Sequence, residues 1–556
     1  MRLARSFGAQ GRHRAWPARR RKGLLAVAAG LAATALAATT MVGAPAVSAS
    51  STETVIVTAS GPLSPVTAVQ DVLGTVLTRF QIINGVEASI PTALEPVLAA
   101  LPGITVTPDV SVSVQSAVES TGPHTPSDEF LQQTGATQLA EAGDIGQGVT
   151  VAVIDTGIDN LPDFAGRLIG GVDLTGENNP FQDDYGHGTF VAGLIAGDGA
   201  SSGGQYEGEA PGANLVSIKV AGANGLTDLV RLILGLQWAV ANRLTYNIRI
   251  LNMSLGFQPT ESTTVNPLDQ AVEAAWNSGI AVVVSAGNAG PSNGTILSPG
   301  DDPLVITVGA LDDMAQPNVA DDEMTNFSSV GPTSPDGWVK PDLVTSGRSV
   351  VSLAAPGSTV YDENPSARIG SGNFVGSGTS FSSAITSGAA ALVLADNPAL
   401  TPDELKARLL GTTNPGPVGN PFVDGHGALN AYAAATAGPM NLSQSTLGLV
   451  LTLAGATVSL SPVSSLVSSW NASLWSGASW PQGPASGPSW NGTGWNGSAW
   501  NGFTWSSRAW NQGGWDGAAW NGQTWSGSAW DGSAWAGSAW NSAAWNGSAW
   551  NASEWN

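Results

Sequence analysis

The chain has no cysteine among its 556 residues. Neither disulfide bonds nor thiolate metal sites can therefore stabilise it, and the folded state must depend on its apolar core. A chain of this length can bury such a core and can hold two or three domains.

Basic residues are scarce as well: 20 Lys and Arg face 42 Asp and Glu, for a formal net charge of −22. Eight of the 20 lie within the first 22 positions, where there is no acidic residue. The acidic remainder would repel a phosphate backbone, so nucleic acid is excluded as an expected partner. Charged residues make up only 11% of the chain, which argues against the acidic coat of a salt-adapted protein.

Residues 1–49 have the three parts of a secretory signal peptide. A basic segment ends at residues 19–22, an Ala- and Leu-rich segment follows, and small residues close the pattern at 47–49. The paired arginines leave a twin-arginine route open. A membrane anchor is the alternative, but the small closing residues favour cleavage. We expect a secreted or extracellular protein, with association with the cell surface left open.

Two folded segments follow. Residues 50–120 predict a small βαββαβ unit, with strands at 54–58, 82–90 and 104–109 and helices at 66–80 and 94–101. Residues 125–438 alternate apolar β-branched runs, at 149–154, 215–218, 248–253, 280–284 and 304–308, with helical stretches, at 227–243, 267–278 and 379–396. Such alternation predicts an α/β fold in which helices cover both faces of a parallel sheet. The side chains of an active site are then expected at the carboxyl ends of the strands.

A linker, residues 439–465, leads to a tryptophan-rich repeat at 466–556. Tryptophan recurs at every fifth position from 490 to 555, and the repeat holds 17 of the chain's 21 tryptophans. A period of five scatters side chains around a helix and alternates them across a flat strand. A solenoid with five residues per side would make every tryptophan equivalent, whereas Asn-Gly turns would suit a flexible chain. A low-complexity tail, a surface- or glycan-binding or self-associating module, and a removable secretion appendage all remain open.

Four polar side chains stand at the ends of predicted elements. Asp155 ends an apolar strand, His187 opens a helix between two glycines, Asn288 follows another strand, and Ser380 begins a long helix. Each alone could be a turn residue or a helix cap, but their combination across an α/β pattern predicts an active site. The glycines around His187 and Ser380 are expected to let the backbone approach a bound peptide.

These residue types suit nucleophilic catalysis. A serine hydroxyl is a weak nucleophile until an imidazole takes its proton, and a carboxylate fixes the tautomer of that imidazole and stabilises its cation. A serine in the first turn of a helix offers its backbone N–H and the positive end of the helix dipole to a developing oxyanion. The side-chain amide of Asn288 can supply the second donor.

The motifs D-T-G at Asp155, H-G-T-x-V-A-G at His187, A-G-N at Asn288 and G-T-S at Ser380 resemble the subtilisin (subtilase, S8) family of serine peptidases. The resemblance extends over about residues 136–434. It implies a catalytic triad of Asp155, His187 and Ser380, with Asn288 in the oxyanion hole. It also implies that substrate binds along a set of further residues: Ser254, Leu255, Gly256, Ala286 and Gly287.

Two positions depart from the family pattern. After G-T-S the family has Met-Ala-x-Pro, whereas this chain continues with Phe381 and the residues 382–384 (Ser-Ser-Ala), which affects the entry angle of the helix rather than the reaction. Leu297 stands where many relatives have a small residue at the base of the S1 pocket. We therefore expect a shallow S1 pocket for small or medium apolar side chains.

The resemblance gives residues 50–120 the role of an inhibitor-type propeptide, which helps the enzyme to fold, lies in the active site and is removed autocatalytically. We expect cleavage between about Val114 and Asp128, and a permanent N-terminal domain is the alternative. The partners implied are polypeptide substrates and the chain's own propeptide.

Relatives commonly bind structural calcium, so a structural calcium ion is left open, but no metal site is predicted from these residues. Asp159, Asp163, Asp183 and Asp184 supply oxygen atoms near the expected site, yet no segment has dedicated ligand spacing. Solvated loop acids are the favoured interpretation, and Asp183 or Asp184 could instead form part of the surroundings of the histidine. No redox or nucleotide cofactor is implied.

The predicted function is that of a secreted serine endopeptidase that hydrolyses peptide bonds through an acyl-enzyme. The alternative is a surface adhesion or structural protein in which an inert subtilase scaffold carries a tryptophan-rich binding tail. The presence of all four chemical groups weighs against this alternative, because an inert scaffold has no reason to keep them.

Overall fold

The computed structural model describes residues 51–60, 63–114 and 125–438, together with short strands between residues 450 and 550. The expected signal peptide, residues 1–49, lies outside the described residues. Among the helices that are described, none combines the length and the apolar character needed to span a lipid bilayer.

Residues 52–108 form a four-stranded antiparallel sheet in the order β2-β3-β1-β4. The elements follow the βαββαβ order expected from the sequence: β1 (Thr52–Ala59), α2 (Pro65–Asp71), β2 (Thr75–Arg79), β3 (Gly85–Pro91), α3 (Glu95–Ala99) and β4 (Ile104–Pro108). The helix predicted at 66–80 is wrong in its second half, which is strand β2. Leu73, at a φ of 58°, ends the helical conformation, and the β-branched residues that follow pair with β3 instead.

The large sheet has the order β14-β13-β12-β10-β6-β8-β7, with β15 also paired to β13. All its pairs are parallel except that of β13 with β14. Every residue of β6, β12 and β13 is buried, as a sheet covered on both faces requires. The predicted α/β class is confirmed. The strands are β6 (Thr150–Asp155), β7 (Leu168–Asp173), β8 (Asn214–Lys219), β10 (Ile248–Met253), β12 (Ala281–Ser285), β13 (Ile306–Asp312), β14 (Glu323–Met324) and β15 (Leu343–Ser346).

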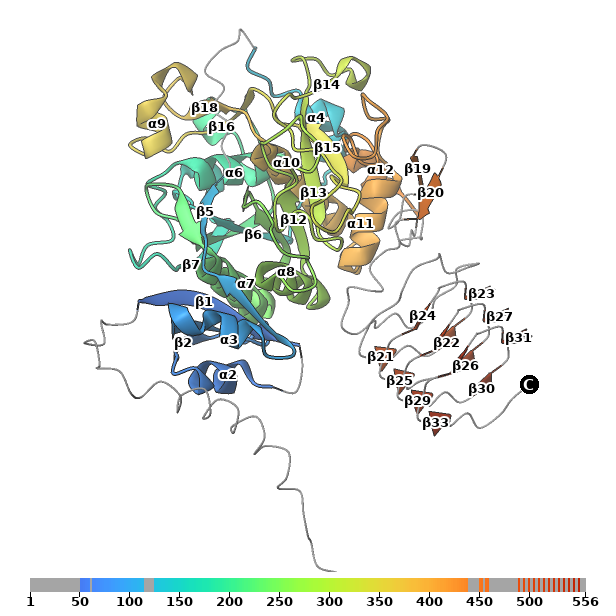
Figure 1. Ribbon diagram of the computed structural model, residues 1–556. Coiled ribbons are helices and arrows are strands. Elements are labelled where there is room, and N and C mark those ends of the chain that lie inside the picture. Colours follow the sequence, from blue (N-terminus) through green and yellow to red (C-terminus); the bar gives the residue numbers. More distant parts are fainter. Residues whose placement is uncertain are drawn as a thin grey trace, which may run out of the picture. The chain divides into compact units, whose positions relative to one another are not determined.

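Helices pack on the large sheet in two groups (Figure 1). In one group α7 and α8 contact each other, and in the other α10 contacts α6, α11 and α12. Of the 18 residues of α10, 16 are buried, because this helix carries small, apolar and hydroxyl side chains on all sides, with no charged residue before Asp396, and packs on the sheet and on other helices. The helices are α4 (Phe130–Gln133), α5 (Ala136–Glu141), α6 (His187–Ala196), α7 (Leu229–Tyr246), α8 (Pro267–Asn277), α9 (Thr359–Glu363), α10 (Thr379–Asp396), α11 (Pro402–Gly411) and α12 (Ala431–Thr436).

Two small sheets complete this part of the chain, in the orders β11-β5-β9 and β16-β18-β17. The first joins β5 (Ser111–Val114), β9 (Leu226–Asp228) and β11 (Leu255–Gly256). The second joins β16 (Val350–Leu353), β17 (Arg368–Ile369) and β18 (Asn373–Gly376).

In the C-terminal part, β19 (Val450–Leu453) and β20 (Ala456–Ser459) form an antiparallel hairpin. Beyond them a two-residue strand recurs every five residues, from β21 (Ser489–Trp490) to β33 (Ala549–Trp550). Each strand from β21 to β29 pairs in parallel with the strand 20 residues later, as in the series Trp490, Trp510, Trp530 and Trp550. This is the strand pairing of a solenoid with four five-residue sides per coil. What the tail binds stays a prediction.

Two buried lysines hold the loop before β13. Lys406 Nζ donates hydrogen bonds to the three carbonyl oxygens of residues 303–305, at 3.0, 3.2 and 2.8 Å, and lies 3.2 Å from Asp342 Oδ1. Lys340 Nζ lies 2.7 Å from Asp342 Oδ2. Removal of one cation would leave part of this carboxylate and several carbonyls buried without a partner.

We expect Lys406→Met to lower the free energy of unfolding by about 3 kcal/mol, the cost of breaking a buried ion pair from one side. As a matched control, Arg231→Met removes a half-exposed partner of Asp228 and is expected to cost less than about 1 kcal/mol. Urea unfolding of both variants in a Ser380→Ala background, which prevents self-digestion, measures the difference. Equal losses in the two variants would contradict the importance of the buried lysine.

Candidate active site

Asp155 and His187 meet where β6 ends and α6 begins. His187 Nδ1 lies 2.8 Å from Asp155 Oδ1 and 3.0 Å from Oδ2, and both side chains are 1% exposed. Nε2, on the other side of the ring, is buried and has no hydrogen-bond partner. A carboxylate at Nδ1 fixes the tautomer in which Nε2 can accept a proton.

Ser380 is the second residue of α10 and is fully buried. Its Oγ donates a hydrogen bond of 3.2 Å to the carbonyl oxygen of Ser254. Its own carbonyl oxygen accepts from Ser254 Oγ at 3.0 Å and from Ser383 Oγ at 2.8 Å. The serine is therefore fixed against the connection between β10 and β11. Its backbone N–H belongs to the first turn of α10, where amides have no partner within the helix.

Asn288 follows β12 and is held by Thr379, the first residue of α10. Asn288 Oδ1 accepts hydrogen bonds from the backbone N and from Oγ1 of Thr379, both at 2.9 Å. Gly287 N also donates to Thr379 Oγ1, at 3.2 Å. These contacts fix the orientation of the amide, with the donor Nδ2 on the side away from Thr379. Sequence reasoning missed this role of Thr379, although the residue is part of the G-T-S motif.

The residues expected to bind substrate lie on two neighbouring segments. Ser254 joins β10 to β11, which consists of Leu255 and Gly256, while Ala286 and Gly287 come directly after β12. Between Gly256 and Gly287 lies Leu297, which is 7% exposed: a Cβ added to Gly256 would be 3.0 Å from Leu297 Cβ, and one added to Gly287 would be 2.7 Å from its Cγ. Leu297 therefore packs against both glycines, while its place at the base of an S1 pocket stays a prediction. The preference of that pocket stays a prediction.

Strand β5 lies between β9 and β11 and is antiparallel to both. Val114 pairs with Leu255, and Val114 N donates a hydrogen bond of 3.0 Å to Gly225 O. Val112 and Val114 are buried, whereas the two serines that alternate with them are exposed. An extended segment is thus bound by main-chain hydrogen bonds on both edges, with alternate side chains in contact with the protein.

Phe381, the residue that departs from the family pattern, lies beside the imidazole. Its ring centroid is 5.7 Å from that of His187 and 4.4 Å from that of Phe190. A Cβ on Gly376 would lie 2.6 Å from the Phe381 ring, so only glycine leaves room for it. Helix α10 nevertheless begins at Thr379, as the sequence predicted.

The glycines beside His187 have a different role from the one expected. A Cβ on Gly188 would collide with the carbonyl oxygen of Gly157, and one on Gly186, whose φ is 104°, would collide with Ser358 Oγ. These glycines allow segments of the protein itself to come into close contact. They therefore serve the packing of the site rather than the binding of a peptide.

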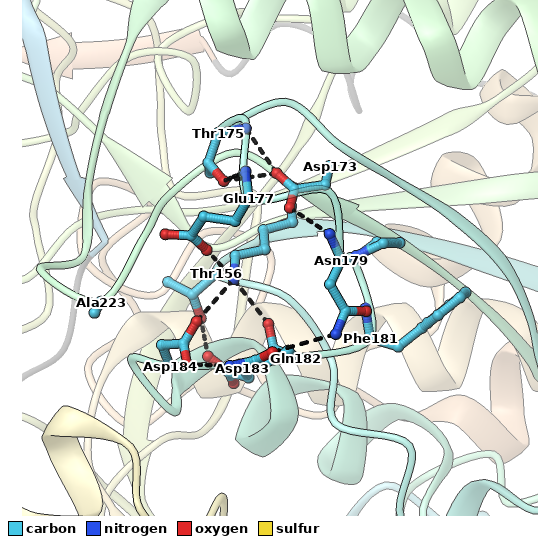
Figure 2. Close-up of polar contacts among 12 residues, drawn as sticks. Thr156, Asp173, Thr175, Glu177, Asn179, Phe181, Gln182, Asp183, Asp184 and Ala223 are labelled. Atoms are coloured by element: carbon cyan, nitrogen blue, oxygen red, sulfur yellow. Dashed lines mark hydrogen bonds and ion pairs between the residues drawn. The ribbon is translucent and has the colours of Figure 1, made fainter.

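The sequence favours the interpretation of four acidic residues near the site as solvated loop acids: Asp159, Asp163, Asp183 and Asp184. This interpretation is wrong for two of them. Asp163 and Asp183 are 0% and 3% exposed. Burial raises the pKa of Asp183 to about 6, against the lowering effect of its hydrogen-bond donors. Asp184 Oδ2 lies 3.2 Å from the Nζ of Lys219 (Figure 2). Within the described part of the chain, no group of three or more His, Asp or Glu side chains is placed to hold a metal ion.

Comparisons with known proteins identify the family of the chain. The family model described as the subtilase family matches residues 146–434. Serine protease AprX of Bacillus subtilis is 45% identical over 295 residues, which are 51% of this chain and 66% of AprX. Subtilisin NAT of Bacillus subtilis subsp. natto is 36% identical over 309 residues, which are 55% of this chain and 70% of that protein. The chain thus spans just under two thirds of the length of AprX.

Among solved structures, the crystal structure of fervidolysin from Fervidobacterium pennivorans, a keratinolytic enzyme related to subtilisin, is similar to the structure of this chain. The TM-score is 0.55 at 23% identity, over 72% of this chain and 62% of fervidolysin, a likeness that shows the fold. The family match covers more than half of the chain and includes every residue predicted to take part in the reaction. The chain belongs to the subtilase family of serine proteases.

Proposed function

We propose that the chain is an exported serine endopeptidase that hydrolyses polypeptides through an acyl-enzyme. The observation that carries the proposal is the buried contact of 2.8 Å between His187 Nδ1 and Asp155 Oδ1. An imidazole held in this way, with Nε2 unpartnered, can act as the general base for a serine hydroxyl.

In the proposed reaction, His187 Nε2 removes the proton from Ser380 Oγ as Oγ attacks the carbonyl carbon of the scissile bond. For this step Ser380 exchanges its hydrogen bond to Ser254 for one to His187. Asn288 Nδ2 and the backbone N–H of Ser380 stabilise the oxyanion, and Asp155 stabilises the imidazolium. The proton then passes to the leaving amine, which gives the acyl-enzyme. Water, deprotonated by His187 in turn, hydrolyses the ester and frees Ser380.

The substrate is proposed to bind as an extended strand between β9 and β11, where β5 lies. The pairing of Val114 with Leu255 and the burial of alternate side chains support this, because a peptide bound by two strand edges needs no particular sequence for its main-chain bonds. Residues 50–120 are accordingly proposed to be the inhibitory propeptide, whose last strand occupies the substrate cleft.

The register of β5 predicts where the propeptide is cut. Val114 is opposite Leu255, so one further residue in the same register would be opposite Ser254, whose carbonyl oxygen accepts the hydrogen bond of Ser380 Oγ. We expect self-cleavage at one of the first three peptide bonds after Val114. Intact-mass measurement and N-terminal sequencing of the mature protein locate the cut. A mature N-terminus upstream of residue 115 or beyond residue 117 would contradict this register of binding.

Export is proposed from the signal-like residues 1–49, so that the enzyme acts outside the cytoplasm. The tryptophan-rich residues 466–556 are proposed to contact a cell surface or glycans, since aromatic rings stack on the faces of sugars.

The direct test is hydrolysis of casein and of peptide anilides by the purified mature protein. The proposal predicts hydrolysis that a serine-directed sulfonyl fluoride abolishes, and an ester or peptide substrate should show a burst of the first product when deacylation is slower than acylation. Hydrolysis that resists this reagent, or none at all after the propeptide has been removed, would refute it.

A further inference from the structure

Asp183 is a buried carboxylate that the proposed reaction does not use. It precedes His187 by four positions and is 3% exposed. Its Oδ1 accepts hydrogen bonds from Thr156 Oγ1 and from the backbone N of Gly186, both at 2.7 Å. Its Oδ2 accepts from the backbone N of Thr189, also at 2.7 Å. All of these donors are uncharged, so the carboxylate is stabilised by dipoles alone.

These contacts join the two segments that carry the Asp155–His187 pair. Thr156 is the neighbour of Asp155, and its Oγ1 also accepts a hydrogen bond of 2.9 Å from Gly188 N. Helix α6 begins after Gly186, which has no side chain to cap it. Asp183 acts as that cap, because it accepts from the N-cap amide of Gly186 and from Thr189 N, one of the first-turn amides that have no partner within the helix. One carboxylate therefore links the end of β6 to the first turn of α6.

A neighbouring cation, Lys219, is bound by other groups, among them Glu177 and Asp184, which Figure 2 labels. Lys219 Nζ bonds the carbonyl oxygen of Gln182 at 2.9 Å, and it pairs with Asp184 at 3.2 Å and with Glu177 at 2.7 Å. It thereby anchors the residues on either side of Asp183 rather than its carboxylate. The position of that carboxylate is thus set by its three donors.

We propose that Asp183 is a positioning residue for the hydrolysis proposed above: its ionised carboxylate holds the end of β6 and the start of α6 so that His187 Nδ1 stays in contact with Asp155. The inference rests on the proposed function and deepens it. A small displacement of a general base costs a large factor in rate, so the effect should fall on kcat rather than on KM.

Asp183→Asn is the first test, because it keeps the shape but turns one acceptor into a donor that faces a backbone N–H. We expect kcat to fall about 30-fold while KM changes less than about threefold. Asp144→Asn is the matched control: Asp144 is 5% exposed and also accepts a hydrogen bond from a backbone amide, Gly146 N at 3.0 Å, but lies before β6. It should leave kcat unchanged even if it lowers the melting temperature.

Thr156 provides a second pair of variants, which keeps the inference testable if Asp183→Asn fails to fold. Thr156→Val removes the hydroxyl that bonds Asp183, and it should lower kcat as Asp183→Asn does. Thr156→Ser keeps the hydroxyl and should restore most of the activity. The double variant Asp183→Asn/Thr156→Val should be no slower than either single variant, because both break the same link.

The pH profile separates positioning from stability. Protonation of Asp183 puts a hydrogen opposite an N–H donor, so activity should fall as this carboxyl takes up a proton. Below about pH 6, log kcat of the wild type should therefore fall more steeply than that of Asp183→Asn. Burial raises the pKa of Asp159 as well, and its Oδ1 accepts the backbone N–H of Asp183, so Asp159→Asn is measured alongside. The other titratable groups around the site are Asp155, Glu177, Asp184, Tyr185, His187 and Lys219.

The outcomes distinguish the inference from the function on which it rests. An active wild type together with an Asp183→Asn variant of equal kcat and equal acid slope would overturn the inference alone. So would a loss of kcat in Asp144→Asn as large as that in Asp183→Asn. A wild-type protein without serine-dependent hydrolysis would instead refute the proposed function, and the inference with it.

Discussion

Ser380→Ala is expected to abolish hydrolysis, with kcat lower by about 10⁶-fold, because it removes the proposed nucleophile, and the neighbouring hydroxyl at the start of α10, Thr379 Oγ1, is bonded to Asn288 Oδ1 at 2.9 Å. The same substitution should leave the precursor uncut, since the propeptide is proposed to be removed by the enzyme's own active site. A gel of the purified variant should therefore show one band at the precursor mass, while the wild type shows the mature enzyme.

Ser382→Ala is the matched control for this experiment. Ser382 lies two positions further along α10, is also buried, and donates to the carbonyl oxygens of Thr345 and Ser346 at 3.1 Å. Its loss removes hydrogen bonds but no nucleophile, so processing should continue. A Ser380→Ala protein that is still processed during expression would assign the cut to another protease. One that hydrolyses casein at the wild-type rate would refute the assignment of the nucleophile.

Asp155→Asn is expected to lower kcat by about 10⁴-fold with little change in KM. The asparagine amide can place an N–H donor opposite His187 Nδ1, which favours the tautomer whose proton sits on Nε2. That nitrogen could then no longer accept a proton from serine. The rate of precursor conversion and the rate of hydrolysis of a peptide anilide by protein freed of its propeptide both measure the effect.

Asp173→Asn serves as the control for the acid. Asp173 ends β7 and accepts hydrogen bonds from Thr175 and Asn179, and donors from these residues lower its pKa against the effect of burial, but it does not contact His187. Its substitution should change kcat less than about threefold. Equal activity of Asp155→Asn and the wild type would contradict the role of the 2.8 Å contact.

The sequence predicted the framework of the fold well, because apolar periodicity reports burial directly. Helix α10 has the bounds predicted for it, Thr379–Asp396, and the strand Ile248–Met253 was predicted without error. Both elements are almost completely buried, so their sequence patterns are determined mainly by burial. The prediction of a helix at 66–80 is wrong in its second half, because the apolar spacing of this segment fits a helix and a strand equally. Only the turn at Leu73 separates helix α2 from strand β2.

The environment of the site was less predictable than its motifs. Asp183 lies in a loop and Asp163 in a short 3-10 helix, where burial of an acidic side chain is exceptional, and only contacts from distant segments explain it. The space that Phe381 fills beside His187 depends on Gly376 and Phe190, which no local pattern connects. The role of Thr379 was hidden for the same reason, since its partner Asn288 is 91 positions away.

The central claim is that Ser380 is made reactive by His187, and labelling with a fluorophosphonate tests it most directly. The mature protein should take up one label, located by peptide mass spectrometry on Ser380, and His187→Ala should slow the labelling by several orders of magnitude. Label on another residue, or labelling of Ser380 at the same rate in His187→Ala, would contradict the account.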